Sequence, residues 1–314
     1  MNFNNKTRFI FYLLLFPILF FSINLSACSG FPIYAQQSYE SPRETTGRIV
    51  CANCHLAQKP VKVEVPQAVL PNNIFEVVVK IPYPDNSQQL LGNGKKGPLN
   101  VGAIVILPEG FQLAPKNQIP KKLQAQNKNI YIQPYSKSQK NILVVGPISG
   151  NIYKEIVFPI IAPDPTQNKN VHFLKYPIYA GGNRGRGQIY PTGEKSNNNI
   201  ITALTKGKIN KIDSLDQGGF NVSIEDLNKN LTIQKIPPGI DLNVVEGDNV
   251  KLDQALTKDP NIGGFGQDET EIVLQSPIRI QGMIVFFFII TIAQIFFILK
   301  KKQFEKVQAI EINF

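Results

Sequence analysis

A five-residue motif, Cys51-Ala52-Asn53-Cys54-His55, sets the strictest geometric demand in this chain. Two cysteines separated by two residues, with a histidine directly after them, form the attachment pattern of c-type haem. One short turn must bring both thiols to the same edge of the porphyrin, while the imidazole of His55 reaches the iron as an axial ligand. The motif therefore predicts one haem c, bound covalently through Cys51 and Cys54.

Other uses of these cysteines fit the sequence less well. A structural zinc site needs four ligands, and outside the motif only Cys28 and His172 remain, with Cys28 in a segment that we expect to be removed. A redox dithiol would need a βαβ context, which the surrounding sequence lacks. A plain disulfide would leave His55 without a role.

The N-terminus has the features of a secretory signal. Basic residues precede an apolar run over residues 9–21, and small residues follow it. This pattern is typical of a signal peptide and not of a membrane span. We expect the signal to cover residues 1–30, so that the mature chain begins at Phe31. Residues 25–28 also resemble a bacterial lipoprotein box, and cleavage there would instead leave a lipidated Cys28.

An uncharged segment near the other end predicts one membrane-spanning helix. Residues 280–299 carry no charge, and at about 1.5 Å per residue they reach about 30 Å, the thickness of the hydrocarbon core. Lys300, Lys301 and Lys302 follow directly. The positive-inside rule therefore places the tail, residues 300–314, on the side from which the chain is exported.

The charge of the chain limits the class of partner. The net charge is +10, but part of it lies in the signal and the tail, which leaves a mild basic surplus on the exported part. Such a surplus suits an acidic protein partner. Nucleic acid is excluded as a partner because of the compartment.

Short apolar runs between turn clusters predict a mainly β fold. The 23 prolines and 23 glycines are spread along the chain, which argues against a helical bundle. Runs of strand length recur at residues 74–81, 103–107, 142–145, 152–161, 240–245 and 271–274. They predict an antiparallel β-sandwich or barrel, and of the two we expect an elongated β-sandwich. In the exported part we expect one helix, at residues 42–50, capped through Ser41, Pro42 and Glu44.

A change of composition at residues 197–199 predicts a second, smaller domain. From there to about residue 260 the chain is richer in lysine and aspartate, with short apolar runs. Val245-Glu246-Gly247-Asp248 resembles a turn of lipoyl and biotinyl carrier domains, which indicates a barrel-sandwich-like β fold but no carrier function. We expect a large haem-binding domain at residues 31–198 and 261–279, with the small β domain, 199–260, inserted.

The residues alone leave the second axial ligand of the iron open. Methionine is common at this position in small cytochromes. Here, however, Met1 is expected to leave with the signal, and Met283 lies in the expected span. His172, an open site, a tyrosine or an amine remain.

Four stretches give the chain a specific family resemblance: residues 31–37, 47–55, 181–190 and 300–307. In them the chain resembles the cytochrome f family of chloroplasts and cyanobacteria, and the resemblance runs along essentially all of the chain after residue 30. It implies that the α-amino group of Phe31 is the second axial ligand beside His55. The family usually has tyrosine there, and phenylalanine removes the phenol but keeps the amine.

The resemblance also implies roles for other side chains. Those around the haem are Tyr34, Pro147, Arg186 and Pro191. Those along an internal water chain, a proposed proton path, are Gln89, Asn183, Gln188, Asn198 and Asn261. Lys95 and Lys96 match a basic patch that steers a soluble partner. Gln88 and the acidic loop at 213–217 stand where the family often has lysine, so we expect weaker steering here.

The function implied by the resemblance is electron transfer and not catalysis. We expect an electron carrier of photosynthesis that takes electrons from the Rieske iron–sulfur protein and passes them to plastocyanin or a soluble c-type cytochrome. Cytochrome b6 and the other subunits of the cytochrome b6f complex are its expected partners. The expected location is the plastid thylakoid membrane, with the haem domain in the lumen and the tail in the stroma.

Two rival functions stay open on the residues alone. One is an enzyme whose haem has an open sixth position and binds peroxide or a small gas. The other is a structural role in assembling the complex.

Overall fold

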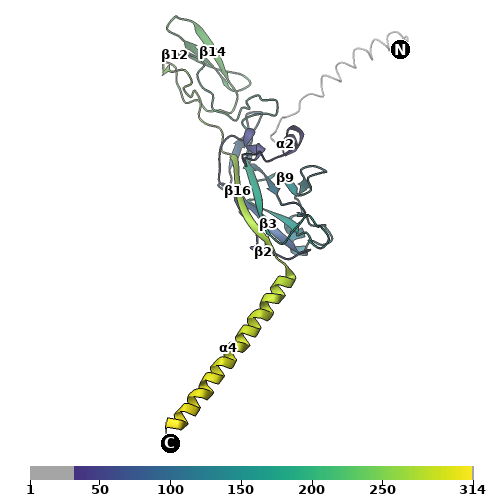
Figure 1. Cartoon of the computed structure of the whole chain (residues 1–314). Helices are drawn as coiled ribbons and strands as arrows, with labels where there is room; N and C mark the ends of the chain where they lie inside the picture. Colours follow the sequence, from purple (N-terminus) through teal and green to yellow (C-terminus); the bar gives the residue numbers. More distant parts are fainter. Residues whose placement is uncertain (1–31, 313–314) are drawn as a thin grey trace, which may run out of the picture.

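The structure, a computed structural model, describes residues 32–312 of the chain. It is elongated and mainly β, and one long C-terminal helix leaves the end of the β body (Figure 1). The predicted fold class is therefore confirmed. Phe31 and the predicted signal peptide lie outside the described residues.

Two facing sheets form the β body. One has six strands, in the order β2 (Ala68–Val69), β16 (Gly264–Leu274), β11 (Lys175–Arg184), β6 (Asn100–Ile106), β9 (Ile142–Ser149) and β8 (Gln133–Pro134). Its neighbouring strands are antiparallel, except that β16 and β2 run parallel. The other has four, in the order β1 (Lys62–Glu64), β3 (Ile74–Lys80), β10 (Glu155–Ile161) and β7 (Gln112–Leu113).

The main hydrophobic core lies between these sheets. Along β3, Phe75, Val77 and Val79 are buried and alternate with more exposed neighbours, as expected when one face of a strand covers a core. They share one cluster with Val105 of β6 and Ile178 of β11 in the opposite sheet. Burying this apolar surface fixes the sandwich, and with it the loops at its two ends.

A separate sheet projects from the body at the end opposite the long helix (Figure 1). Its strands are, in order, β14 (Leu231–Ile236), β13 (Phe220–Glu225), β12 (Gly207–Ser214) and β15 (Asn249–Val250). It has its own core, to which Leu90 contributes from the hairpin of β4 (Gln88–Leu90) and β5 (Lys96–Pro98). The boundaries 199 and 260 of the small domain stay a prediction.

Two local predictions are wrong. Residues 42–49 form no helix, and only Val50, at the start of a short 3₁₀ helix, is helical. Arg43 and Ile49 pair as an isolated β-bridge, and Gly47 at the turn has a φ of +87°, which a right-handed helix does not allow. The Ser41 hydroxyl donates to the Arg43 carbonyl and caps no helix. Residues 240–245 form no strand, although Ile240 and Val244 are buried in the small core, because an apolar run predicts burial more reliably than strand pairing.

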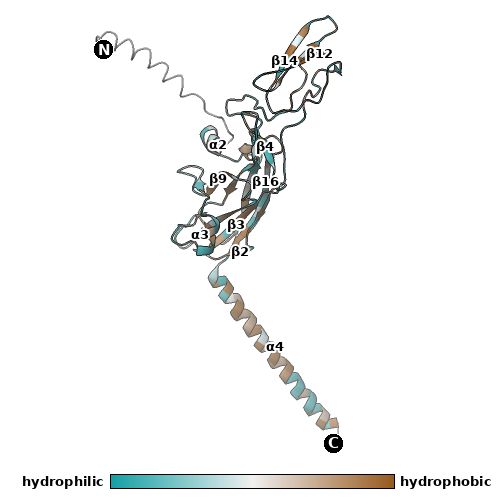
Figure 2. Ribbon diagram, turned by 180° about the vertical axis from the view of Figure 1, so that it is seen from behind, coloured by the Kyte–Doolittle hydropathy of each residue, from teal (hydrophilic) through white to brown (hydrophobic). Residues whose placement is uncertain are grey.

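The described residues contain three α-helices and one short 3₁₀ helix. They are α2 (Pro32–Ser38), α3 (Lys121–Gln126), α4 (Pro277–Ile312) and the 3₁₀ helix η1 (Val50–Asn53). Within the described part, only α4 is long and apolar enough to cross a membrane. Its apolar side chains are exposed and follow the middle of the helix (Figure 2). The helix also includes most of the tail, so it is longer than the predicted span at 280–299.

Candidate haem-binding site

The cysteine motif forms a tight turn that begins in the 3₁₀ helix η1. The main-chain N–H groups of Cys54 and His55 both donate to the Cys51 carbonyl, at 3.3 Å and 3.0 Å. Both thiols are free and half-buried, and His55 is only 5% exposed. One turn therefore holds two thiols that are not linked to each other beside a buried imidazole.

A loop at residues 185–190 packs against this turn. The main-chain N–H groups of Gln188 and Ile189 donate to the Cys54 carbonyl, at 2.8 Å and 3.2 Å. The Gln188 side chain accepts a hydrogen bond from the Leu56 N–H at 2.9 Å. Gly187 is needed for this close approach, because a Cβ there would lie 3.1 Å from the Cys54 carbonyl oxygen. The loop and the motif thus fix each other, although they are far apart in the sequence.

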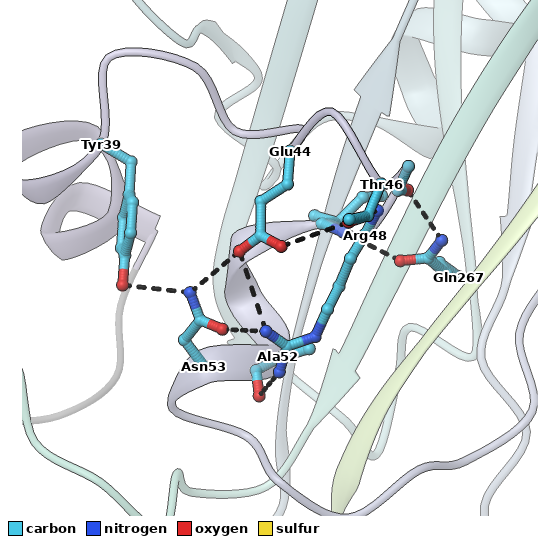
Figure 3. Close-up of polar contacts among 9 residues, drawn as sticks. Tyr39, Glu44, Thr46, Arg48, Ala52, Asn53 and Gln267 are labelled. Carbon is cyan, nitrogen blue, oxygen red and sulfur yellow. Dashed lines mark hydrogen bonds and ion pairs between the residues drawn. The ribbon is translucent and has the colours of Figure 1, made fainter.

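A polar network braces the residues between the two cysteines (Figure 3). Asn53 donates to the Tyr39 hydroxyl at 3.1 Å and to the Glu44 carboxylate at 3.5 Å, and it accepts from the Arg48 guanidinium. Arg48 also donates to the Ala52 carbonyl at 3.0 Å. The network satisfies polar groups at both residues that separate Cys51 from Cys54, so it holds the turn in one shape.

Gln267 of β16 joins the segment that leads into the motif (Figure 3). Its side chain accepts from the Ile49 N–H at 2.9 Å and donates to the Gly47 carbonyl at 3.1 Å. Gln267 was not predicted as a site residue, because no local sequence signal marks a residue so distant from the motif along the chain. Arg48 and Asn53 were also missed, although polar residues flanking and inside the motif could have been singled out.

Helix α2 places the start of the described chain beside the motif. The hydroxyl of buried Tyr135 lies 2.7 Å from the carbonyl oxygens of both Ala35 and Tyr39, which share its one hydrogen. Gln36 donates in turn to the Tyr135 carbonyl at 2.8 Å. Burial raises the pKa of the Tyr135 phenol to about 12, so the hydroxyl stays protonated and keeps donating at neutral pH. Tyr135 is therefore the main anchor of the N-terminal segment.

We expect Tyr135→Phe to destabilise the fold by about 1 kcal/mol, because the half-buried carbonyls of Ala35 and Tyr39 lose the one hydroxyl that they share. The Ala35 carbonyl keeps the Tyr39 N–H as a second donor. The folded-state pKa of about 12 lies above the ordinary phenol value of about 10. The stabilisation should therefore be complete below pH of about 10 and disappear as the pH rises through about 12. Urea unfolding of both proteins at neutral and at strongly alkaline pH measures this.

Tyr131→Phe is the matched control for this prediction, because the Tyr131 side chain is 74% exposed and its loss of a hydroxyl should change little. Equal stabilities of the wild type and Tyr135→Phe at neutral pH would contradict the anchoring role.

A cavity of about 200 Å³ lies beside α2 and the edge of the six-stranded sheet. Pro32, Val144 and Pro147 are among its lining residues, and Val144 packs in one apolar cluster with Cys51. Pro147 and Pro191 are exposed, and Tyr34 is half-buried. An apolar ligand held by the cysteines could cover these rings.

These residues fit a c-type haem better than a bare metal ion. Burial raises the pKa of Cys51 to about 12 and also raises that of Cys54, so both thiols are protonated at neutral pH. A structural zinc ion is held by four side chains. No group of three or more His, Cys, Asp or Glu side chains that could hold a metal ion occurs within residues 32–312. Two free thiols, a buried imidazole and nearby apolar rings match the parts that haem attachment needs.

Arg186 belongs to the loop beside the motif, but its guanidinium contacts the β4–β5 hairpin. It donates to the Leu90 carbonyl at 2.9 Å, to Asn197 Oδ1 at 2.6 Å and to the Tyr190 hydroxyl at 3.1 Å. The side chain therefore ties the hairpin to the loop that contacts Cys54.

The five amide side chains that were predicted to line a water chain lie in or near the segment 183–188. Asn198 donates to Asn261 Oδ1 at 3.1 Å, and Gln188 donates to the Asn198 carbonyl at 3.4 Å. Asn183 donates to the Gly185 carbonyl at 3.3 Å, and a Cβ on Gly185 would lie 3.5 Å from Gln89 Oε1. The buried oxygens Gln89 Oε1 and Asn183 Oδ1 have no hydrogen-bond partner among the described residues.

His172 lies far from the motif. It precedes β11, whereas the loop at 185–190 follows the other end of that strand. A strand of 10 residues spans about 33 Å at about 3.3 Å per residue. His172 is exposed, and its backbone N–H and carbonyl both bond the Tyr176 hydroxyl. It cannot reach an iron that His55 ligates.

Lys95 and Lys96 are exposed on the β4–β5 hairpin. Gln88 lies on the same hairpin, and Lys96 pairs with Leu90 across it. In the acidic loop, Asp213 forms an ion pair with Lys211 at 2.5 Å. The two lysines therefore stand next to the residues that Arg186 ties to the motif loop.

Comparison with known proteins covers nearly the whole chain. The family model for the N-terminal part of apocytochrome F matches residues 31–185, and the model for its C-terminal part matches residues 197–314. Cytochrome f of Pyropia yezoensis is 68% identical over 289 residues, which are 92% of this chain and 90% of that protein. Cytochrome f of Chlorokybus atmophyticus is 59% identical over 309 residues, 98% of this chain and 96% of that protein.

The similarity extends to a land plant. Cytochrome f of Marchantia polymorpha is 56% identical over 319 aligned positions, which cover 100% of this chain and 99% of that protein. The matched regions include the cysteine motif, the loop at 185–190 and the C-terminal helix.

Proposed function

The chain belongs to the cytochrome f family, and from this premise we propose that it passes electrons from the Rieske iron–sulfur protein to plastocyanin or a soluble c-type cytochrome. The family membership makes it a cytochrome f electron carrier with a c-type haem and a member of the cytochrome b6f complex. The partners named here are our proposal. The observation that supports it most is the turn that holds two free thiols and a buried imidazole together.

Each residue of the turn has a proposed task. Cys51 and Cys54 would hold the porphyrin through thioethers, and His55 would ligate the iron from one side. The haem, when bound, supplies an iron that gains and loses one electron. The hydrogen bonds of Gln188, Asn53 and Arg48 hold the turn in one shape, so these ligands would stay fixed in both redox states. No substrate bond is broken by this subunit.

The second axial ligand in this proposal is the α-amino group of Phe31. Pro32, the next residue, lines the cavity that adjoins the Cys51 cluster, and Tyr135 anchors α2 there. Tyr34, Pro147 and Pro191 would cover the haem and exclude water. Arg186 would lie at its edge through the loop that it stabilises.

The buried amides support the proposed water chain. Buried polar atoms are almost always hydrogen-bonded to protein or to ordered water. The oxygens of Gln89 and Asn183 therefore suit water molecules that continue the series Gln188, Asn198 and Asn261. Such a series could carry protons away from the site.

For the topology we propose a single membrane span at α4, in the thylakoid membrane. The β body would lie in the lumen and the lysine-rich tail in the stroma. The exposed apolar surface of α4 and the three lysines at 300–302, which follow the uncharged part of the helix, support this orientation.

An optical titration tests the function against its rivals. The purified haem protein should show a six-coordinate low-spin spectrum that cyanide and carbon monoxide do not shift, and it should reduce plastocyanin in a rapid-mixing experiment. A shift on adding either ligand would favour an enzyme with an open site. Normal electron flow in membranes that carry a His55 variant would favour a purely structural role.

Lys95 and Lys96 should govern the salt dependence of partner docking. We expect Lys95→Gln/Lys96→Gln to slow association with an acidic carrier several-fold in dilute buffer and to leave the haem spectrum unchanged. At an ionic strength of about 0.1 M the Debye length is about 10 Å, so the difference should shrink as salt is added. Stopped-flow rates at several salt concentrations measure it.

Lys137→Gln/Lys140→Gln is the matched control, since both lysines are exposed but lie outside the hairpin. Because Gln88 and the Asp213 loop lack the lysines that the family often has there, the loss should be smaller than for a complete basic patch. If Lys95→Gln/Lys96→Gln had the same salt dependence of association as the wild type, docking would depend on apolar contacts instead.

A further inference from the structure

Main-chain hydrogen bonds join several segments at the end of the body from which α4 leaves. The main-chain N–H of Leu274 donates to the Leu174 carbonyl at 2.9 Å, and the N–H of Gln275 to the Val69 carbonyl at 2.9 Å. The N–H of Asn72 donates to the Ala162 carbonyl at 3.0 Å. α3, which contacts β10, lies toward the same end of the body (Figure 2). If α4 crosses a membrane, this end faces the membrane surface.

The charge of this end is strongly unbalanced. Between Glu109 and Glu155 the sequence has no acidic residue. The exposed cationic side chains at this end are Lys116, Lys121, Lys122, Lys128, Lys169 and Arg279. None of them forms an ion pair with another residue in the range 32–312. The acidic residues near them include Glu109, Asp164 and Glu271. Asp164 accepts hydrogen bonds from Thr166 and Asn72, and Glu271 forms an ion pair with Lys175.

Exposed apolar side chains lie beside these cations. Phe173 is 38% exposed and Leu174 55%, in the connection that is bonded to Leu274. Ile278, in the first turn of α4, is 81% exposed. Large apolar side chains surrounded by basic ones are typical of protein surfaces that rest in the interface of an anionic membrane.

We propose that this end of the β body is a lipid-binding surface that rests on the leaflet through which α4 enters. In this arrangement Phe173, Leu174 and Ile278 insert among the headgroups, and the unpaired lysines, chiefly Lys121 and Lys122, contact anionic lipid headgroups. The surface would fix the height and tilt of the body above the membrane, which a single helix alone does not. The inference depends on the proposed single-pass topology.

The absence of tryptophan from the chain permits a direct test. Phe173→Trp introduces one fluorophore at the proposed surface of the full-length protein, which is incorporated in lipid nanodiscs. Brominated phosphatidylcholine should quench the indole at position 173. We expect the quenching to increase when phosphatidylglycerol is added, and to fall again in high salt. Comparing each protein with itself in the two lipid mixtures cancels quenching by the haem.

Matched variants separate the lipid contact from general effects. Leu227→Trp places the indole on an 85% exposed turn of the small domain, where no bromine quenching is expected in either lipid. In the Phe173→Trp protein, Lys121→Gln/Lys122→Gln should remove the gain that phosphatidylglycerol gives. Lys229→Gln/Lys235→Gln, which neutralises two exposed lysines of the small domain, should leave that gain intact.

Two results would overturn the proposal. One is equal quenching at position 173 with and without phosphatidylglycerol in protein that has entered the discs. The other is quenching that disappears when further subunits of the complex are present, which would make this end a subunit contact. A chain that does not enter discs at all would instead overturn the membrane topology itself, so the two failures are distinguishable.

Discussion

Replacing both motif cysteines, as Cys51→Ser/Cys54→Ser, is expected to abolish covalent retention of haem by the polypeptide. Each thiol is proposed to form one thioether, and serine cannot add to the vinyl groups in the same way. Either single substitution should leave at most one bond and a much smaller amount of attached haem. The measurement is haem staining after acid–acetone extraction and denaturing electrophoresis, normalised to the amount of protein.

Ala52→Ser is the matched control for the cysteine variants. It introduces the same side chain one residue away, at a half-buried position of the same turn, and should keep haem attached. If the double variant still carried haem after extraction, the motif would not be the attachment site, and the proposed cofactor chemistry would be wrong. The experiment tests the residues themselves, independently of any electron-transfer assay.

The sandwich was predictable because its strands have clear local patterns. The run at 74–81 predicted β3, whose valines are buried in the core between the sheets. The uncharged run at 280–299 predicted the centre of α4. In both cases the residues that determine the element lie within it, so a short window of sequence contains the information.

The supports of the haem-binding turn were not predictable in this way. The contact of Gln267 with Ile49 depends on β16 lying beside the motif, which is a property of the whole sandwich. The turn at Gly47 was mistaken for a helix, since Ser41, Pro42 and Glu44 are typical of a helix start whatever follows them. The thiols and the imidazole could be named from spacing, whereas the groups that hold them come from distant strands and loops.

His172 shows how the structure narrows a choice that the sequence left open. From the residues alone it was a candidate for the second axial ligand. The length of β11 separates it from the motif loop, so it is removed from the candidates by distance. Phe31 lies outside the described residues, and its role as the ligand stays a prediction.

The largest spectral effect is expected from blocking signal cleavage after residue 30. A free α-amine has a pKa of about 7.7–8.0, so giving up its proton at neutral pH costs only about 1 kcal/mol. Before cleavage the same nitrogen belongs to an amide and has no usable lone pair for iron. Retained signal should therefore leave a five-coordinate or misligated haem, which is seen as loss of the low-spin absorption spectrum.

Substitutions at position 31 distinguish the effect of the α-amino group on the haem spectrum from the effect of the aromatic ring. Phe31→Tyr and Phe31→Trp should keep the low-spin spectrum, because the ligand is a backbone atom and the ring only packs beside it. Phe31→Pro should perturb the spectrum moderately, since a secondary amine still donates but approaches the iron with a fixed ring. N-terminal sequencing of the mature protein shows whether residue 31 is in fact its first residue.

His172→Gln provides the decisive comparison for the axial ligand. The histidine is exposed and lies beyond the far end of β11 from the motif loop, so its substitution should leave the low-spin spectrum intact and alter stability at most. The retained signal, by contrast, should abolish that spectrum while His55 and both thioethers are unchanged. If His172→Gln made the haem high-spin and the retained signal did not, the amine would not be the ligand. The position of His172 relative to the motif would then differ from the one described here.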